Sequence, residues 1–176
     1  LGVRTLEANW GEAVPPERVA EALDRDPKIR GVFVQLSESS TGACHDIEAL
    51  ARIARARPDT QLVVDAISGA GAMKLETAAW GVDIVVVGSQ KALALPPGLA
   101  FLSASQRAWA RIDASTAPRF YFDLRRERKA QAGGESAFTP AISLLIALEA
   151  ALDSVEGMGG VLGLVQNAGT LAAMTR

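Results

Sequence analysis

Cysteine and histidine are almost missing from this sequence, with Cys44 and His45 the only residue of each kind. A single cysteine cannot form an internal disulfide, so the chain needs no oxidising compartment, and we expect a cytoplasmic location. Cys44 has no CxxC partner, and we expect its thiol to be buried. One histidine leaves too little material for a metal site built from paired histidines or for a Ser–His–Asp triad.

An excess of charge and long apolar runs are missing as well. Eighteen basic residues stand against 20 acidic ones, a net charge of −2, which argues against a nucleic-acid partner. No apolar run reaches the roughly 18 residues that a membrane span needs, so no membrane partner is expected. The 176 residues are enough for one domain with a core of its own.

What the sequence does contain is an alternation of short apolar runs and helical patterns. The runs lack the polar–apolar alternation of a half-exposed sheet and are typical of strands covered on both faces. They lie at residues 31–36, 61–65, 83–88 and 98–103. Helices are expected between them at 15–23, 46–57 and 75–80. This order predicts an α/β fold, with a mostly parallel mixed sheet flanked by helices.

After residue 103 the pattern becomes helical. Amphipathic helices are expected at 106–112 and 121–131. Thr139 and Pro140 fit the N-cap and first position of an apolar helix over 141–155. A last helix is expected over 161–176.

Lys91 is the most unusual residue of the sequence. It is the only charged residue between Asp83 and Arg107, and it follows an apolar strand. Burial would favour the neutral amine, which a lysine that reacts with a carbonyl group requires. Alternatively, its stem covers apolar surface while the amine reaches solvent.

Two other predicted strands also end in polar residues. Asp65 closes the run at 61–65, and the segment Ser37 to Gly42 follows the first run. Ligands of open α/β sheets bind at the carboxyl ends of the strands. Asp65 could therefore bind a metal, a ribose hydroxyl or a cationic ring nitrogen, or it could cap a turn. Ser40, Asp65 and Lys91 are expected together at one edge of the sheet.

Several motifs occur in an order that resembles the class V aminotransferase family. They are Glu38-Ser-Ser-Thr-Gly42, Val64-Asp-Ala-Ile-Ser68, Trp80-Gly-Val-Asp83, Gly88-Ser-Gln-Lys-Ala-Leu93, Pro96-Pro-Gly-Leu-Ala100 and Phe138-Thr-Pro140. The similarity is greatest to the branch of alanine–glyoxylate, serine–glyoxylate and serine–pyruvate aminotransferases. The resemblance implies pyridoxal 5'-phosphate as cofactor and the fold of aspartate aminotransferase, known as fold type I, with this chain forming most of the large domain.

The resemblance also implies roles for particular residues. Lys91 would hold the cofactor as a Schiff base, the internal aldimine, and would later move a proton between the substrate and the cofactor. Asp65 would pair with the pyridine nitrogen, and Ile67 would pack on a face of the ring.

Three further residues would contact the cofactor. Gln90 would reach its phosphate, and Ser40 would hydrogen-bond near its phenolic oxygen. Thr139 would contact the phosphate bound by the neighbouring subunit. This last role implies a homodimer with shared active sites.

The resemblance predicts that residues 1–160 form the large cofactor-binding domain without its N-terminal part. Residues 161–176 would start a helix that leads to a small C-terminal domain. The phosphate loop and the arginine that binds the substrate carboxylate would lie outside the chain. We therefore expect residues 1–176 alone to show no transaminase turnover.

The expected reaction moves an amino group from a small amino acid (serine or alanine) to a 2-oxo acid (glyoxylate or pyruvate). One alternative is another pyridoxal phosphate reaction on the same fold, that of a lyase or a desulfurase. Related desulfurases place a histidine before the lysine, where this chain has Gln90. The other alternative is a non-catalytic, truncated paralogue.

Overall fold

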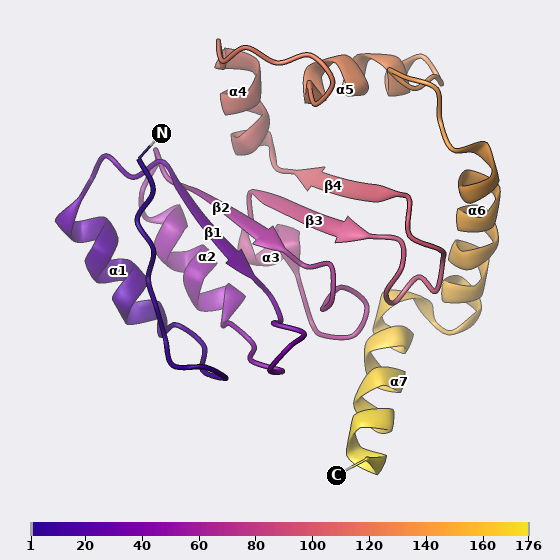
Figure 1. The fold of residues 1–176 in the computed structure, drawn as a ribbon, viewed down its shortest axis with the longest axis horizontal. Coiled ribbons are helices and arrows are strands. Elements are labelled where there is room, and N and C mark those ends of the chain that lie inside the picture. Colours follow the sequence, from indigo (N-terminus) through magenta and orange to yellow (C-terminus); the bar gives the residue numbers. More distant parts are fainter. Residues whose placement is uncertain (1, 176) are drawn as a thin grey trace.

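A four-stranded mixed sheet organises the computed structural model, which describes residues 2–175 (Figure 1). Its strands are β1 (Gly31–Gln35), β2 (Gln61–Asp65), β3 (Ile84–Gly88) and β4 (Ala100–Ala104), side by side in that order. β1, β2 and β3 are parallel, whereas β4 runs antiparallel to β3. The expected fold class, a mostly parallel sheet flanked by helices, is confirmed.

Three helices, one before β1 and one in each connection between the parallel strands, cover one face of this sheet. They are α1 (Pro16–Arg25), α2 (Ile47–Arg55) and the short α3 (Thr77–Trp80). Leu62 and Val64 of β2 are fully buried in the core together with Leu50 and Ala51 of α2. Because side chains alternate along a strand, the neighbours of these two residues in β2 face the other side of the sheet.

That other face is more open. Phe33 in β1 is aligned with Val63 in β2, and its side chain is 79% exposed. Asp65 lies on this same face, at the carboxyl end of β2. An acidic side chain is thereby presented beside apolar ones.

Four helices form the second half of the chain. They are α4 (Gln106–Ala114), α5 (Leu124–Ala132), α6 (Ile142–Gly157) and α7 (Gly160–Met174). In Figure 1, α4 and α5 lie beyond β4, and α6 and α7 follow on the side where β3 ends and β4 begins. Within residues 2–175, no helix is long and apolar enough to cross a membrane.

Two expectations from the sequence are wrong. Thr139 and Pro140 do not open α6, because its first turn closes on the Ala141 carbonyl, which accepts the N–H groups of Leu144 and Leu145. Cys44 is exposed and not buried. Its thiol lies in a loop and donates to the Gly42 carbonyl, 3.3 Å away.

A buried ion pair ties the sheet to α4. Asp83 is 2% exposed, and it accepts hydrogen bonds from Arg107 Nε at 2.8 Å, from the Leu62 N–H at 2.8 Å and from the Ser105 hydroxyl at 3.1 Å. These donors satisfy both carboxylate oxygens, as a buried charge requires.

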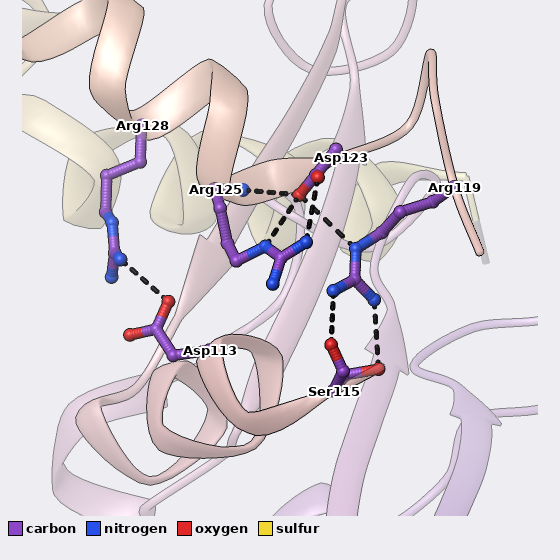
Figure 2. A network of polar contacts seen from close by, with 6 residues as sticks. All are labelled: Asp113, Ser115, Arg119, Asp123, Arg125 and Arg128. Carbon is purple, nitrogen blue, oxygen red and sulfur yellow. Dashed lines mark hydrogen bonds and ion pairs between the residues drawn. The ribbon is translucent and has the colours of Figure 1, made fainter. Parts of the chain in front are cut away.

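A second polar network joins α4 to α5 (Figure 2). Arg128 bonds Asp113 at 2.8 Å, and Arg119 donates to the carbonyl and the hydroxyl of Ser115. Asp123 is the N-cap of α5 and pairs with the Arg125 guanidinium. Arg119 Nε lies 3.4 Å from Asp123 Oδ1, a distance typical of an ion pair without a hydrogen bond.

Candidate functional site

Asp65 closes β2 and also organises the turn behind it. Its Oδ1 accepts the N–H of Ile67 at 2.9 Å, and the N–H of Ala66 donates to the Val86 carbonyl at 2.9 Å. The turn and ligand roles that the sequence left open for Asp65 are therefore compatible. One oxygen holds the turn, while the exposed carboxylate is free to contact a ligand.

A cavity of about 600 Å³ lies on the open face, at the carboxyl ends of β1, β2 and β3. Asp65, Ile67 and Lys91 all line it. The other lining residues are Phe33, Val34, Gln35, Ser37, Glu38, Ser39, Val63, Ser68 and Val86. The cavity thus brings together three of the six residues predicted from the sequence, contributed by the end of β2 and by the loops after β2 and β3.

Ser40 does not line this cavity but fixes the loop after β1. Its N–H and its hydroxyl both donate to Glu38 Oε1, at 2.9 and 2.7 Å. These bonds hold the pKa of Glu38 below its usual value, and the bond from the N–H has a larger effect than that from the hydroxyl. In this structure Ser40 therefore acts on a cavity-lining carboxylate.

Ser39 and Ser68 are cavity residues that sequence reasoning missed. Their hydroxyl oxygens lie 2.5 Å apart and join the loop after β1 to the loop after β2. Both lie within motifs that carry the family resemblance. Their contact pairs residues that are 29 positions apart, which sequence spacing alone could not indicate.

Gln90 and Thr139 also lie outside the lining of this cavity. The Gln90 side chain folds back over Gly88, where an added Cβ would stand 2.6 Å from Gln90 Oε1. Thr139 is exposed in the segment between α5 and α6. The structure thus brings neither residue into the site around Lys91 and Asp65.

The side chains of the cavity fit a cofactor that carries an aldehyde and a basic ring nitrogen. Lys91, which lines the cavity, offers a primary amine. Asp65 offers a carboxylate for a protonated ring nitrogen, and Ile67 offers an apolar surface for the ring. The cavity thus holds an amine and a carboxylate near neighbouring strand ends, the two groups that such a cofactor requires.

Residues 2–172 match the family Aminotransferase class-V, and the chain belongs to this family. Its cofactor is pyridoxal 5'-phosphate, the group that the residues of the cavity fit.

Curated relatives include proteins named as aminotransferases and proteins named as hydrogenase subunits. The chain is 38% identical over 161 residues to the soluble hydrogenase small subunit of Synechococcus sp. strain PCC 6716, covering 90% of this chain and 42% of that protein. It is 37% identical to the L-aspartate–glyoxylate aminotransferase of Paracoccus denitrificans, covering 92% and 42%. It is 33% identical to the serine–glyoxylate aminotransferase of Hyphomicrobium methylovorum, also covering 92% and 42%. The chain thus spans less than half the length of these relatives.

Solved structures share the fold. An alanine–glyoxylate aminotransferase from Nostoc sp. superposes with a TM-score of 0.85 at 28% identity, covering 93% of this chain and 43% of that one. An aspartate aminotransferase of subgroup IV from Thermus thermophilus gives a TM-score of 0.77 at 38% identity, covering 92% and 44%. A cysteine desulfurase from Thermococcus onnurineus, at 21% identity and a TM-score of 0.55, covers 74% and 33% and shares the fold alone.

Proposed function

We propose that the protein is a transaminase that moves an amino group from a small amino acid to a 2-oxo acid. The observation that carries this proposal is the cavity that Lys91 and Asp65 share at neighbouring strand ends, in a chain of the class V family. Serine or alanine as donor and glyoxylate or pyruvate as acceptor are the proposed substrates. Relatives named as glyoxylate aminotransferases support this choice.

Each proposed contact assigns one task to one side chain. Lys91 binds the aldehyde carbon of pyridoxal phosphate and, once displaced, accepts the proton from the substrate α-carbon and returns it. Asp65 keeps a proton on the ring nitrogen, while Ile67 orients the ring by packing against it. Bound pyridoxal phosphate supplies a ring that withdraws electrons from the substrate α-carbon.

The remaining contacts complete the proposed site. Ser40 turns its hydroxyl from Glu38 Oε1, to which it donates at 2.7 Å, and donates near the phenolic oxygen. Gln90 reaches the phosphate by turning away from Gly88. Thr139 contacts the phosphate of a second subunit, since it does not line the cavity of its own chain. A homodimer with shared sites follows from this assignment.

The domain boundary that we propose is the one predicted from the sequence. Residues 1–160 form the large cofactor-binding domain, and residues 161–176 start the helix that leaves it. We place the protein in the cytoplasm, where its single cysteine needs no oxidising partner.

A lyase or desulfurase reaction is the main alternative. Gln90 before Lys91 disfavours desulfuration. Cys44 disfavours it as well, because its thiol donates to the Gly42 carbonyl of its own loop. Product analysis separates the three reactions. Transamination yields a new 2-oxo acid and a new amino acid, a lyase reaction releases ammonia, and a desulfurase releases sulfide.

The experiment that tests the proposal is borohydride reduction of the protein, expressed from its complete gene and incubated with pyridoxal phosphate. Peptide mass mapping is expected to find the reduced label on Lys91. Only three other lysines, Lys28, Lys74 and Lys129, compete in this chain. A label spread over these three and unchanged in Lys91→Ala would refute the cofactor site and favour a non-catalytic paralogue.

A further inference from the structure

The loop that carries Lys91 is organised by a serine that has no role in the proposed chemistry. Ser89 directly follows β3 and is fully buried, with 0% of its surface exposed. Lys91 lies two residues further on and reaches into the cavity. The loop connects β3 to the antiparallel β4 and spans residues 89–99.

Every hydrogen-bonding group of Ser89 is used inside this loop. Its N–H donates to the Leu99 carbonyl at 3.1 Å, and its carbonyl accepts the Leu95 N–H at 3.2 Å. Its hydroxyl donates to the Pro96 carbonyl at 2.8 Å and accepts the Leu99 N–H at 3.3 Å. The side chain therefore connects the first residue of the loop to Pro96 and to Leu99, the last residue of the loop.

Besides the bonds of Ser89, the loop has one backbone hydrogen bond of its own, from the Ala94 N–H to the Lys91 carbonyl at 2.9 Å. Pro96 and Pro97 have no N–H to donate. Ala94 adopts a φ of 54°, and Gly98 a φ of 149°. An added Cβ at Gly98 would stand 2.5 Å from Leu144 of α6, so this turn also packs closely against a helix. Most hydrogen bonds within this loop therefore involve Ser89.

We propose that the Ser89 hydroxyl is a positioning group for Lys91, holding its amine where it meets the cofactor aldehyde beside Asp65. This inference rests on the proposed function. In the step concerned, Lys91 Nζ forms a carbon–nitrogen double bond with the aldehyde carbon, and the aldehyde oxygen leaves as water with the two amine protons. Ser89 touches none of the reacting atoms and acts through the loop.

The test compares Ser89→Ala with a matched control, Thr60→Val. Thr60 is also a buried hydroxyl, 3% exposed, and it donates to the Ile29 carbonyl at 2.9 Å. It lies just before β2, at the opposite end of that strand from Asp65. Both variants lose one buried hydroxyl, so a general loss of stability affects them alike.

Bond formation is followed by absorbance after pyridoxal phosphate is added to cofactor-free protein expressed from the complete gene. In Ser89→Ala the rate constant at saturating pyridoxal phosphate is expected to fall about tenfold, because the hydroxyl's bonds to Pro96 and Leu99 are both lost. The half-saturating concentration is expected to stay unchanged. Thr60→Val is expected to change neither quantity. An unchanged rate constant in Ser89→Ala, or an equal fall in Thr60→Val, would overturn the proposal.

A second measurement needs no cofactor. Hydrogen exchange of the Leu95 and Leu99 amides is expected to be about tenfold faster in Ser89→Ala than in the unmodified protein. If the unmodified protein forms no bond at Lys91, the proposed function is wrong, and this exchange alone then decides whether Ser89 holds the loop. Unchanged exchange would refute that role. Should Ser89→Ala fail to fold, Ser89→Cys replaces the hydroxyl by a weaker donor of similar size, and its rate constant for bond formation at Lys91 is also expected to fall.

Discussion

At the scale of single residues, position at a strand end was the most informative property of this sequence. Asp65 ends one apolar strand and Lys91 follows another, and the structure brings both to one cavity. Ser39 and Ser68 were missed because a contact between two loops depends on the register of β1 against β2. Hydroxyls are common in loops of any kind, so residue type alone could not separate Ser39 from Ser40.

Asp65→Asn tests the charge of the proposed site without disturbing its turn. The amide oxygen of asparagine can still accept the Ile67 N–H, but the side chain no longer pairs with a protonated ring nitrogen. Transaminase kcat is expected to fall by about 10²-fold, a typical loss for one electrostatic contact in an active site. Steady-state kinetics with saturating pyridoxal phosphate measure it.

Asp46→Asn is the matched control for this substitution. Asp46 is the N-cap of α2 and accepts the Ala49 N–H at 2.9 Å, which asparagine also does. Its kcat is expected to equal that of the unmodified protein. Equal kcat values for the two variants would show that the charge of Asp65 has no part in the reaction.

At the scale of helices and strands, apolar runs predicted which elements exist better than where they begin. The strand expected at 61–65 was found at those residues, whereas that expected at 98–103 begins at Ala100. Pairing decides this start, because Ala100 is aligned with Gly88, the last residue of β3. Similarly, α5 begins at Leu124 and not at residue 121, because Asp123 caps it.

The cap of α5 also predicts how the stability of the protein depends on pH. The Arg125 guanidinium, bonded to Asp123, lowers the pKa of that carboxyl to about 2, against an ordinary value of 3.8. A pKa that is lower in the folded state means that the unfolded state binds the proton more tightly. The stabilisation is therefore complete above pH 3.8 and is lost as the pH falls towards about 2.

Asp123→Asn keeps a good N-cap residue but removes the charge. Its urea midpoint is expected to lie below that of the unmodified protein at pH 7, and the difference is expected to shrink as the pH falls from 4 towards 2. Asp113→Asn breaks the exposed pair with Arg128 and is expected to change stability by less than about 1 kcal/mol. A pH-independent difference for Asp123→Asn would contradict the assigned pKa.

At the scale of the whole molecule, the main question is which chain each site residue serves. Lys91 lines the cavity of its own chain, and Thr139 does not. If Thr139 serves a second subunit, a dimer of Lys91→Ala and Thr139→Ala chains contains one site in which both residues are intact. Neither homodimer contains such a site.

Mixing the two variants, followed by dissociation and reassociation, is therefore expected to restore intact sites to about a quarter of the total. Transaminase activity of the mixture, compared with each variant alone and with an unmixed blend, measures this gain. If Thr139 instead acts within its own chain, the mixture cannot exceed the average of the two variants.

The order of the strands bears on how the chain reaches this structure. Each strand lies beside the strand that precedes it in the sequence, with no strand inserted later between two earlier ones among β1 to β4. As the chain leaves the ribosome, each new strand thus meets an edge that has already been synthesised, and domains generally form from the N-terminal side first. Pairing between neighbours in sequence also keeps loop closure short, which favours rapid folding. This sheet can grow in the direction of translation, and the Lys91 loop closes when β4, the last of the four strands, pairs with β3.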